Sequence, residues 1–153
     1  MPSNHGQAAN ESLEISAMIK GVYGVNIAVK NLDEAVARYE AATGIKAEFL
    51  AESDFAFPGL TGAKLNLNGV YLTLISSKVP NTSVSSFLER KGEGVFLLSL
   101  RVDSIESDTA SLKEKGLVFL LDQPARGDFG AVNFVHPKSM HGVQIEIYEP
   151  KES

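Results

Sequence analysis

Hydrophobic and polar residues alternate along residues 22–30, and the pattern then changes to the spacing of an amphipathic helix. Alternation has the period of a β-strand, whereas apolar residues three and four positions apart are typical of a helix. Asn31 precedes the helical pattern and Glu34 follows three residues later, which is the arrangement of a helix N-cap. Gly44 follows the last apolar position and is suited to a left-handed C-cap. We therefore predict a strand and then a helix that ends near Gly44.

The residues that follow this helix predict three more strands. A short strand is expected near residues 46–50, and two longer strands are expected over 61–67 and 70–76. The dipeptide Asn68-Gly69 separates the longer pair. This dipeptide between alternating segments is a strong signal for a two-residue hairpin turn.

The second half of the chain repeats this plan at a constant offset of 73 residues, so that Val102 corresponds to Val29 and Glu106 to Asp33. The repeat predicts, in order, strand 94–102, helix 104–115 and strands 117–122, 129–135 and 142–149. A duplicated unit of this kind predicts two modules related by pseudo-twofold symmetry.

We predict an α+β fold in which two tandem β-α-β-β-β modules form a curved, cup-like mixed sheet with the helices outside. The first module covers residues 21–77, a connecting helix covers 82–92, and the second module covers 94–149. Together they form a single domain over residues 21–149. Residues 1–20 have few large apolar side chains and no periodicity, and they predict a flexible N-terminal tail.

The composition of the 153-residue chain narrows the possible functions. Its net charge is −5 and no basic cluster is present, which argues against nucleic acid or an anionic membrane as the partner. The absence of cysteine excludes disulfides and thiolate chemistry. No apolar run is long enough to span a membrane, and the N-terminus lacks the apolar core of a signal peptide, so the cytoplasm is the expected location.

The strand alternation also predicts which side chains face the hollow side of the sheet. If the uniformly apolar strand faces pack against the helices, the opposite faces line a cavity. These faces mix polar and apolar side chains, as small-molecule sites do. The predicted lining is Asn26, Tyr71, Thr73, Leu97, Ser99, Arg101, Gln144, Glu146 and Tyr148, and Phe57 is expected to cap the pocket from a loop.

A resemblance to a known family is carried by residues 27–36, 87–94, 112–116 and 136–139, the last followed by 142–146. In this order and spacing they resemble the vicinal oxygen chelate superfamily of glyoxalases, bleomycin-resistance proteins and extradiol dioxygenases, and within it the methylmalonyl-CoA epimerases. The resemblance covers most of residues 21–149. It implies the duplicated fold, a small organic ligand and a homodimer.

The resemblance also implies where this superfamily holds a divalent metal ion. The corresponding positions are Gly24, Thr73, Leu97 and Glu146, of which only Glu146 has a side chain suited to ligation. Catalytic metal sites need about three protein ligands. We therefore predict no metal and no cofactor. The second catalytic carboxylate of the epimerases corresponds to Phe57, so that acid–base pair is incomplete as well.

Two functions remain open at this point. The first, which the loss of metal ligands at Gly24, Thr73 and Leu97 favours, is binding of a small organic molecule without a metal, as in the drug-binding members of the superfamily. The second is a metal-independent isomerase or lyase for an acyl-CoA or another small organic acid, with Glu146 as the base and Tyr71, Tyr148, Ser99 or Arg101 positioning an oxyanion. A salt bridge between Glu146 and Arg101 would favour passive binding, whereas an unpaired carboxylate in an enclosed cavity would favour chemistry.

Overall fold

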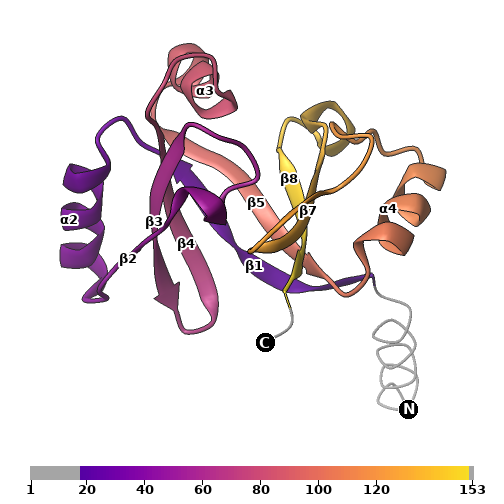
Figure 1. The fold of residues 1–153 in the computed structure, drawn as a ribbon, viewed down its shortest axis with the longest axis horizontal. Helices are drawn as coiled ribbons and strands as arrows, with labels where there is room; N and C mark the ends of the chain where they lie inside the picture. Colours follow the sequence, from indigo (N-terminus) through magenta and orange to yellow (C-terminus); the bar gives the residue numbers. More distant parts are fainter. Residues whose placement is uncertain (1–17, 152–153) are drawn as a thin grey trace, which may run out of the picture.

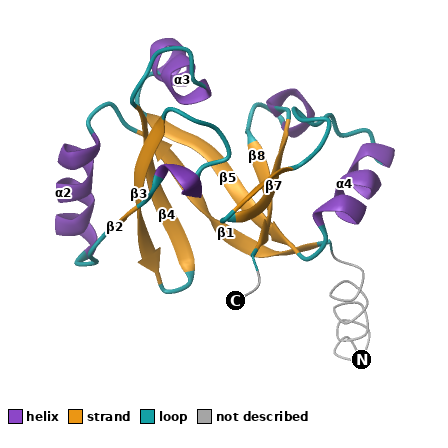
Figure 2. Cartoon of the chain, viewed as in Figure 1, coloured by secondary structure: helices purple, strands orange, loops and turns teal. Residues whose placement is uncertain are grey.

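The computed structural model describes residues 18–151, which form one curled eight-stranded sheet and three α-helices (Figures 1 and 2). The strands are β1 (Ile19–Ala28), β2 (Glu48–Phe49), β3 (Leu60–Leu67), β4 (Val70–Ser77), β5 (Gly94–Val102), β6 (Ala125–Gly127), β7 (Gly130–Val135) and β8 (Ile145–Pro150). The helices are α2 (Leu32–Thr43), α3 (Ser83–Lys91) and α4 (Ile105–Glu114), and two short 3-10 turns, η1 and η2, cover Glu52–Asp54 and Pro137–Met140. Residues 1–17, which hold most of the predicted tail, lie outside the described residues.

The predicted helix caps and hairpin turn of the first module are confirmed. The Asn31 side chain accepts a hydrogen bond from the backbone N–H of Glu34 at 3.0 Å and so caps α2. Gly44 ends the helix in the left-handed conformation at a φ of 72°. Asn68 and Gly69 both have positive φ, 57° and 99°, as a two-residue turn between twisted strands requires.

The sheet contains the expected internal duplication. Its strand order is β2-β3-β4-β1-β5-β8-β7-β6, and β1 and β5 meet in antiparallel orientation at its centre. In the first half Asn26 of β1 lies opposite Thr73 of β4, and in the second half Ser99 of β5 lies opposite Glu146 of β8. Adding 73 to the first pair of numbers gives the second pair, so the two halves share one register.

The two long helices pack on the outside of this sheet, at its two ends (Figure 1). Val36 of α2 belongs to a buried cluster with Leu65 and Leu74, and Ile105 of α4 belongs to another with Ile147. Leu74 points to its helix, so its neighbour Thr73 points to the opposite, concave side. These two helices thus cover one face of the sheet. The third helix, α3, differs from the predicted outside position, because its Val84 packs against Ala28 and Ile75 on the concave face, beside the pocket. No helix among residues 18–151 is long and apolar enough to cross a membrane.

The predicted strand over residues 117–122 is wrong. This segment makes only one isolated bridge, between Phe119 and Val135, and the edge strand is β6 instead. The physical reason lies in Asn133, which is fully buried on β7. Its side-chain oxygen accepts a hydrogen bond from the N–H of Leu121 at 3.3 Å, and its nitrogen donates to the carbonyl of Leu121 at 3.1 Å. A side chain therefore satisfies backbone groups that a strand ladder would otherwise pair.

Replacing Asn133 with alanine is expected to lower the free energy of unfolding by about 2–4 kcal/mol, because it removes the hydrogen-bond partner of backbone groups of Leu121 and Phe134 and opens a buried space. Urea unfolding measures this loss. Asn66→Ala is the matched control, since Asn66 also bonds the backbone, at Gly69, but at an exposed hairpin. An equal loss in the two variants would contradict the role given to Asn133.

Candidate functional site

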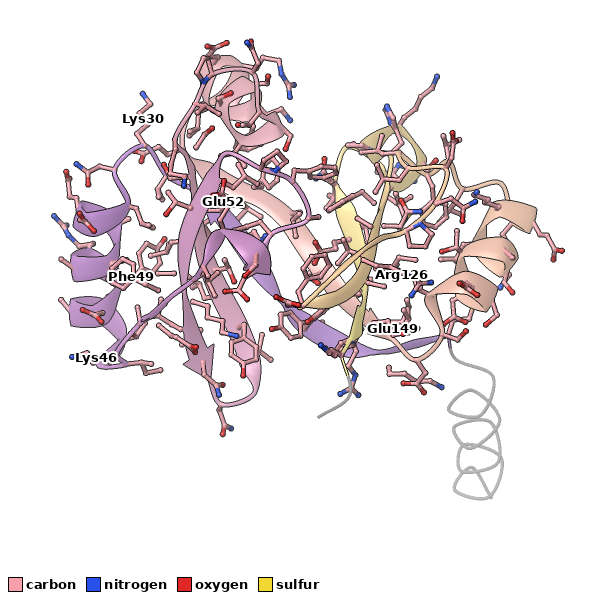
Figure 3. The ribbon with its side chains drawn as sticks, in the orientation of Figure 1. Lys30, Lys46, Phe49, Glu52, Arg126 and Glu149 are labelled. Carbon is pink, nitrogen blue, oxygen red and sulfur yellow. The ribbon has the colours of Figure 1, made fainter. Side chains whose placement is uncertain are left out.

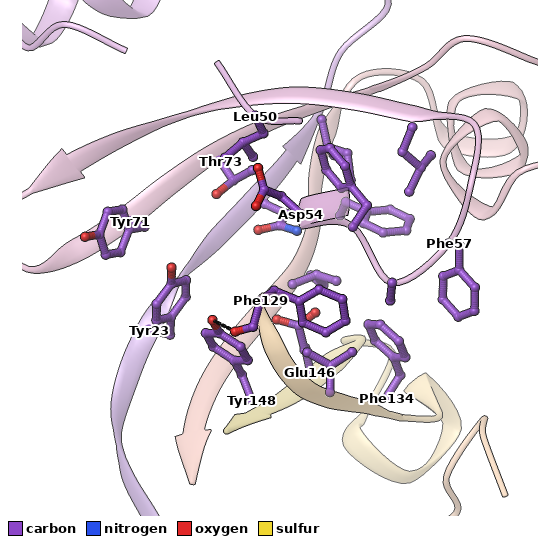
Figure 4. A pocket seen from close by; sticks show the side chains of 18 of the residues that line it. Tyr23, Leu50, Asp54, Phe57, Tyr71, Thr73, Phe129, Phe134, Glu146 and Tyr148 are labelled. Carbon is purple, nitrogen blue, oxygen red and sulfur yellow. Dashed lines mark hydrogen bonds between the residues drawn. The ribbon is translucent and has the colours of Figure 1, made fainter. Parts of the chain in front are cut away.

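A pocket of about 560 Å³ lies on the concave side of the sheet, with lining residues from both modules (Figure 4). Strands β1 and β4 of the first module and β5, β7 and β8 of the second contribute to it, together with the loop around η1. The lining includes most of the residues that the sequence assigned to a cavity: Asn26, Phe57, Tyr71, Thr73, Leu97, Gln144, Glu146 and Tyr148. Their part in binding a ligand stays a prediction.

Two of the predicted lining residues lie elsewhere. Ser99 is almost completely buried in the wall behind the pocket, where its hydroxyl donates to Oε1 of Glu146 at 2.6 Å. Arg101 is exposed at the end of β5, and its guanidinium donates to the backbone carbonyl of Lys20 at 3.3 Å. The salt bridge between Arg101 and Glu146, one of the two alternatives that the sequence left open, is therefore absent from the described residues. A guanidinium at a strand end stays hydrated, which is favourable compared with burial beside a single carboxylate.

Glu146 occupies the pocket without a cationic partner. Within residues 18–151 the two salt bridges join Lys78 to Glu52 and Arg126 to Glu106, and all four side chains are at least half exposed (Glu52 and Arg126 are labelled in Figure 3). Burial raises the pKa of Glu146 to about 7 from its ordinary value of 4.5, and the hydrogen bond from Ser99 opposes this increase. The carboxyl group therefore changes its charge near neutral pH.

Tyr23 lines the pocket although strand alternation assigns it to the opposite face, with Val25. The register of β1 against β5 shifts between Val22 and Gly24, so that two steps along β1 match one step along β5. Such a bulge turns the extra residue to the other side of the sheet. Because the alternation continues unbroken in the sequence, no local signal predicts this shift.

Tyr23, Tyr71 and Tyr148 form an aromatic group beside Glu146, hereafter the tyrosine wall. The ring of Tyr23 stacks on that of Tyr71 with centroids 5.0 Å apart, and it meets Tyr148 edge-on at 4.6 Å. The Tyr148 hydroxyl donates to the carbonyl of Phe129 at 2.6 Å. Burial and the neighbouring charge of Glu146 raise the pKa of Tyr148, and burial likewise raises the pKa of Tyr23. Both phenols therefore keep their protons at neutral pH.

A second carboxylate of the pocket, Asp54, also lies outside the predicted set. It ends the short turn η1, three residues before Phe57, and its carboxylate accepts a hydrogen bond from the N–H of Ala51 at 2.8 Å. Figure 4 shows Asp54 among the side chains that line the pocket, which also include Glu146. The two carboxylates come from different modules, so sequence spacing alone gives no sign that they meet.

The residues at the superfamily's metal positions do not fit a divalent metal ion. A Cβ atom at Gly24 would lie 1.9 Å from the backbone oxygen of Tyr71, so no side chain fits there without movement of the strands. Leu97 is apolar and only 2% exposed, and Thr73 offers only a hydroxyl. Among residues 18–151 no three His, Asp or Glu side chains are grouped to hold a metal. The donor set at this position is therefore a single carboxylate, that of Glu146.

Residues 24–135 match the family model described as the Glyoxalase/Bleomycin resistance protein/Dioxygenase superfamily. An uncharacterized protein, YqjC, of Bacillus subtilis (strain 168) is 26% identical over 128 residues, which are 83% of this chain and 90% of that protein. The mitochondrial methylmalonyl-CoA epimerase of Dictyostelium discoideum is 28% identical over 127 residues, 82% of this chain and 75% of that one.

Solved structures of methylmalonyl-CoA epimerases are also similar to this chain. Methylmalonyl-CoA epimerase from Mycobacterium tuberculosis superposes with a TM-score of 0.80 at 27% identity, covering 90% of this chain and 92% of that chain. A variant of the Streptomyces coelicolor methylmalonyl-CoA epimerase in complex with 2-nitronate-propionyl-CoA also has a TM-score of 0.80, at 28% identity, covering 88% and 99%.

Proposed function

The chain belongs to the glyoxalase/bleomycin resistance protein/dioxygenase superfamily, and from that membership we propose that it is a metal-independent proton-transfer enzyme, an isomerase or a lyase, with Glu146 as its base. One observation carries the proposal: a carboxyl group lines the pocket with a hydroxyl partner and no cation. A salt bridge would have favoured passive binding, and Glu146 has none among the described residues.

Glu146 is suited to both taking and returning a proton. General bases work best when their pKa lies near the working pH, and burial raises the pKa of Glu146 to about 7. Ser99 binds Oε1 of the carboxylate, whereas no described residue hydrogen-bonds Oε2. The orientation of the carboxylate is therefore fixed through one oxygen, and the other is left for a substrate.

Removal of a proton beside a carbonyl also needs a hydrogen-bond donor for the oxyanion that develops. Of the predicted candidates, Ser99 and Tyr148 donate their hydroxyl hydrogens to other acceptors, and Arg101 lies outside the pocket. Tyr71 lines the pocket, and its hydroxyl makes no hydrogen bond within the described part of the chain. We assign the oxyanion donor to Tyr71, assisted by the side-chain amide of Asn26 from the adjacent strand β1.

The substrate class follows from the relatives. Methylmalonyl-CoA epimerases are among the similar proteins, and one neighbouring structure holds an acyl-CoA analogue. These names support an acyl-CoA thioester, or another small organic acid with an acidic C–H group, as the substrate. The relatives therefore supply the reaction class, and the pocket of this chain supplies the base.

Deuterium incorporation into acyl-CoA thioesters tests this function. We expect the wild-type protein, in D2O with EDTA, to exchange the α-proton of at least one of methylmalonyl-CoA, propionyl-CoA and phenylacetyl-CoA. Glu146→Gln should slow the exchange by about 10²–10⁴-fold, because it removes the base. The rate should increase with pH and level off above about 7, since the ionised carboxylate is the active form.

Glu48→Gln, on the exposed edge strand β2, is the matched control and should leave the exchange rate unchanged. Exchange that EDTA abolishes would contradict metal independence. No exchange with any of the three thioesters, or equal rates in the Glu146→Gln variant and the wild type, would exclude Glu146 as the base and leave passive binding.

A further inference from the structure

Aromatic side chains concentrate in the pocket. Eight of the twelve Phe and Tyr residues of the chain line it, including three of the four tyrosines. Proton transfer by a carboxylate does not itself require aromatic neighbours. The aromatic lining therefore indicates a property of the ligand that the proposed reaction does not require.

Six of these rings form two groups, with the tyrosines toward one end of the pocket and Phe57 and Phe134 toward the other (Figure 4). The tyrosine wall comes from β1, β4 and β8. The other group, hereafter the phenylalanine wall, consists of Phe57, Phe129 and Phe134. Phe57 of the first module reaches Phe134 of the second, with ring centroids 6.0 Å apart. The two walls present ring faces and edges, which prefer offset-stacked and edge-to-face contacts with further rings.

Of the substrate classes proposed above, the charges in the lining favour a neutral acyl group over an organic acid. Lys64 and Lys151 are the cationic side chains of the lining, and the Lys64 ammonium already lies 4.8 Å from the ring centroid of Tyr71. Asp54 and Asp128 face the same space as Glu146. No arginine, the residue that pairs most specifically with carboxylates, lines the pocket.

We propose that the pocket binds a neutral aromatic ring between the tyrosine wall and the phenylalanine wall. The ring belongs either to a free phenolic compound, whose hydroxyl is directed to Glu146, or to the acyl part of a thioester, whose α-carbon is directed to Glu146. This inference names a ligand class for the pocket and rests on the proposed function for the assignment of that pocket as the active site.

A matched pair of ligands tests the requirement for aromaticity. 2-Naphthol and its saturated counterpart, decahydro-2-naphthol, share a carbon skeleton and a hydroxyl group. Calorimetry should show that one 2-naphthol binds per chain, at least about fivefold more tightly than the saturated alcohol, which corresponds to the usual advantage of one aromatic contact. 2-Naphthoate should bind more weakly than 2-naphthol, because its carboxylate meets Asp54, Asp128 and Glu146.

Leucine substitutions locate the binding. Tyr71→Leu and Phe134→Leu should each weaken 2-naphthol binding by about fivefold or more. Phe87→Leu is the control, because Phe87 packs edge-on against Phe96, 5.3 Å away, without lining the pocket. The chain has no tryptophan, so tyrosine fluorescence reports chiefly on the pocket and should be quenched by 2-naphthol. Thermal unfolding of each variant verifies that it is folded.

Equal or tighter binding of the saturated alcohol overturns the inference, and so does 2-naphthol affinity that neither wall substitution changes. The binding and exchange experiments also distinguish failure of the ligand class from failure of the proposed reaction. If 2-naphthol binds as expected and no thioester exchanges its α-proton, the proposed reaction fails and the ligand class stands. If only methylmalonyl-CoA and propionyl-CoA exchange and 2-naphthol does not bind, the ligand class fails and the reaction stands.

Discussion

Replacing Gly24 with alanine is expected to destabilise the protein by about 3 kcal/mol or more. A Cβ atom at this position would lie 1.9 Å from the oxygen, 2.8 Å from the carbonyl carbon and 3.1 Å from the Cα of Tyr71. All three are backbone atoms of the paired strand β4, so no side-chain rotation relieves the clash. Urea unfolding measures the effect. Val22→Ala, an exposed position on the same strand, should cost well under about 1 kcal/mol.

The same geometry predicts that Gly24→His does not rebuild a metal site. The imidazole would meet the same backbone contact, and Thr73 and Leu97 would still contribute no ligand comparable to His or a carboxylate. We expect a destabilised protein that binds neither Mn²⁺ nor Co²⁺ in a calorimetric titration. Stoichiometric metal binding with an increased melting temperature would show that the strands separate easily and that the metal position persists in this chain.

Replacing Glu146 with glutamine is expected to stabilise the protein at pH 8 by about 2–3 kcal/mol while removing the base. The pKa of Glu146 is about 7 in the folded protein and near 4.5 when the chain is unfolded. Between these values the folded protein binds a proton that the unfolded chain has lost, so the free energy of unfolding decreases as pH rises from 4.5 to 7. Above pH 7 the penalty is complete, and below pH 4.5 it is absent.

Unfolding by urea at pH 4 and pH 8 therefore distinguishes the Glu146→Gln variant from the wild type. Glu146→Gln should match the wild type at pH 4 and exceed it at pH 8, because glutamine keeps the shape and the hydrogen bond from Ser99 without a charge. The Glu48→Gln control should differ from the wild type by no more than about 0.5 kcal/mol at either pH. A variant that is less stable than the wild type at pH 8 would show that the carboxylate is stabilised in the fold.

Local sequence signals predicted most of this fold because its helix caps and hairpin turns depend on neighbouring residues. The Asn31 cap, the Asn68-Gly69 turn and the 73-residue repeat each act over a few neighbouring residues or through duplication, and all three are present as expected. The segment over 117–122 differed because Asn133, distant in the sequence, supplies its hydrogen bonds.

The site was predicted less completely, since its features depend on contacts between distant segments. Tyr23 lines the pocket because of a shift in strand register, and Asp54 lines it from a turn of the first module, whereas Glu146 belongs to the second. Arg101 lies outside the pocket because the pocket does not extend to the end of β5. Alternation predicts which face a side chain occupies in a regular strand, but it does not predict bulges or how far a cavity extends along the sheet.

The most direct test of the account is the titration of Glu146 itself. The side-chain carboxyl ¹³C signal of Glu146, identified by its absence from the Glu146→Gln variant, is followed by NMR between pH 4 and pH 9. We expect a midpoint near 7, which is the property that lets this carboxyl group move a proton without a metal. A midpoint near 4.5, the ordinary value for glutamate, would show an already ionised surface-like carboxylate and contradict the proposed role.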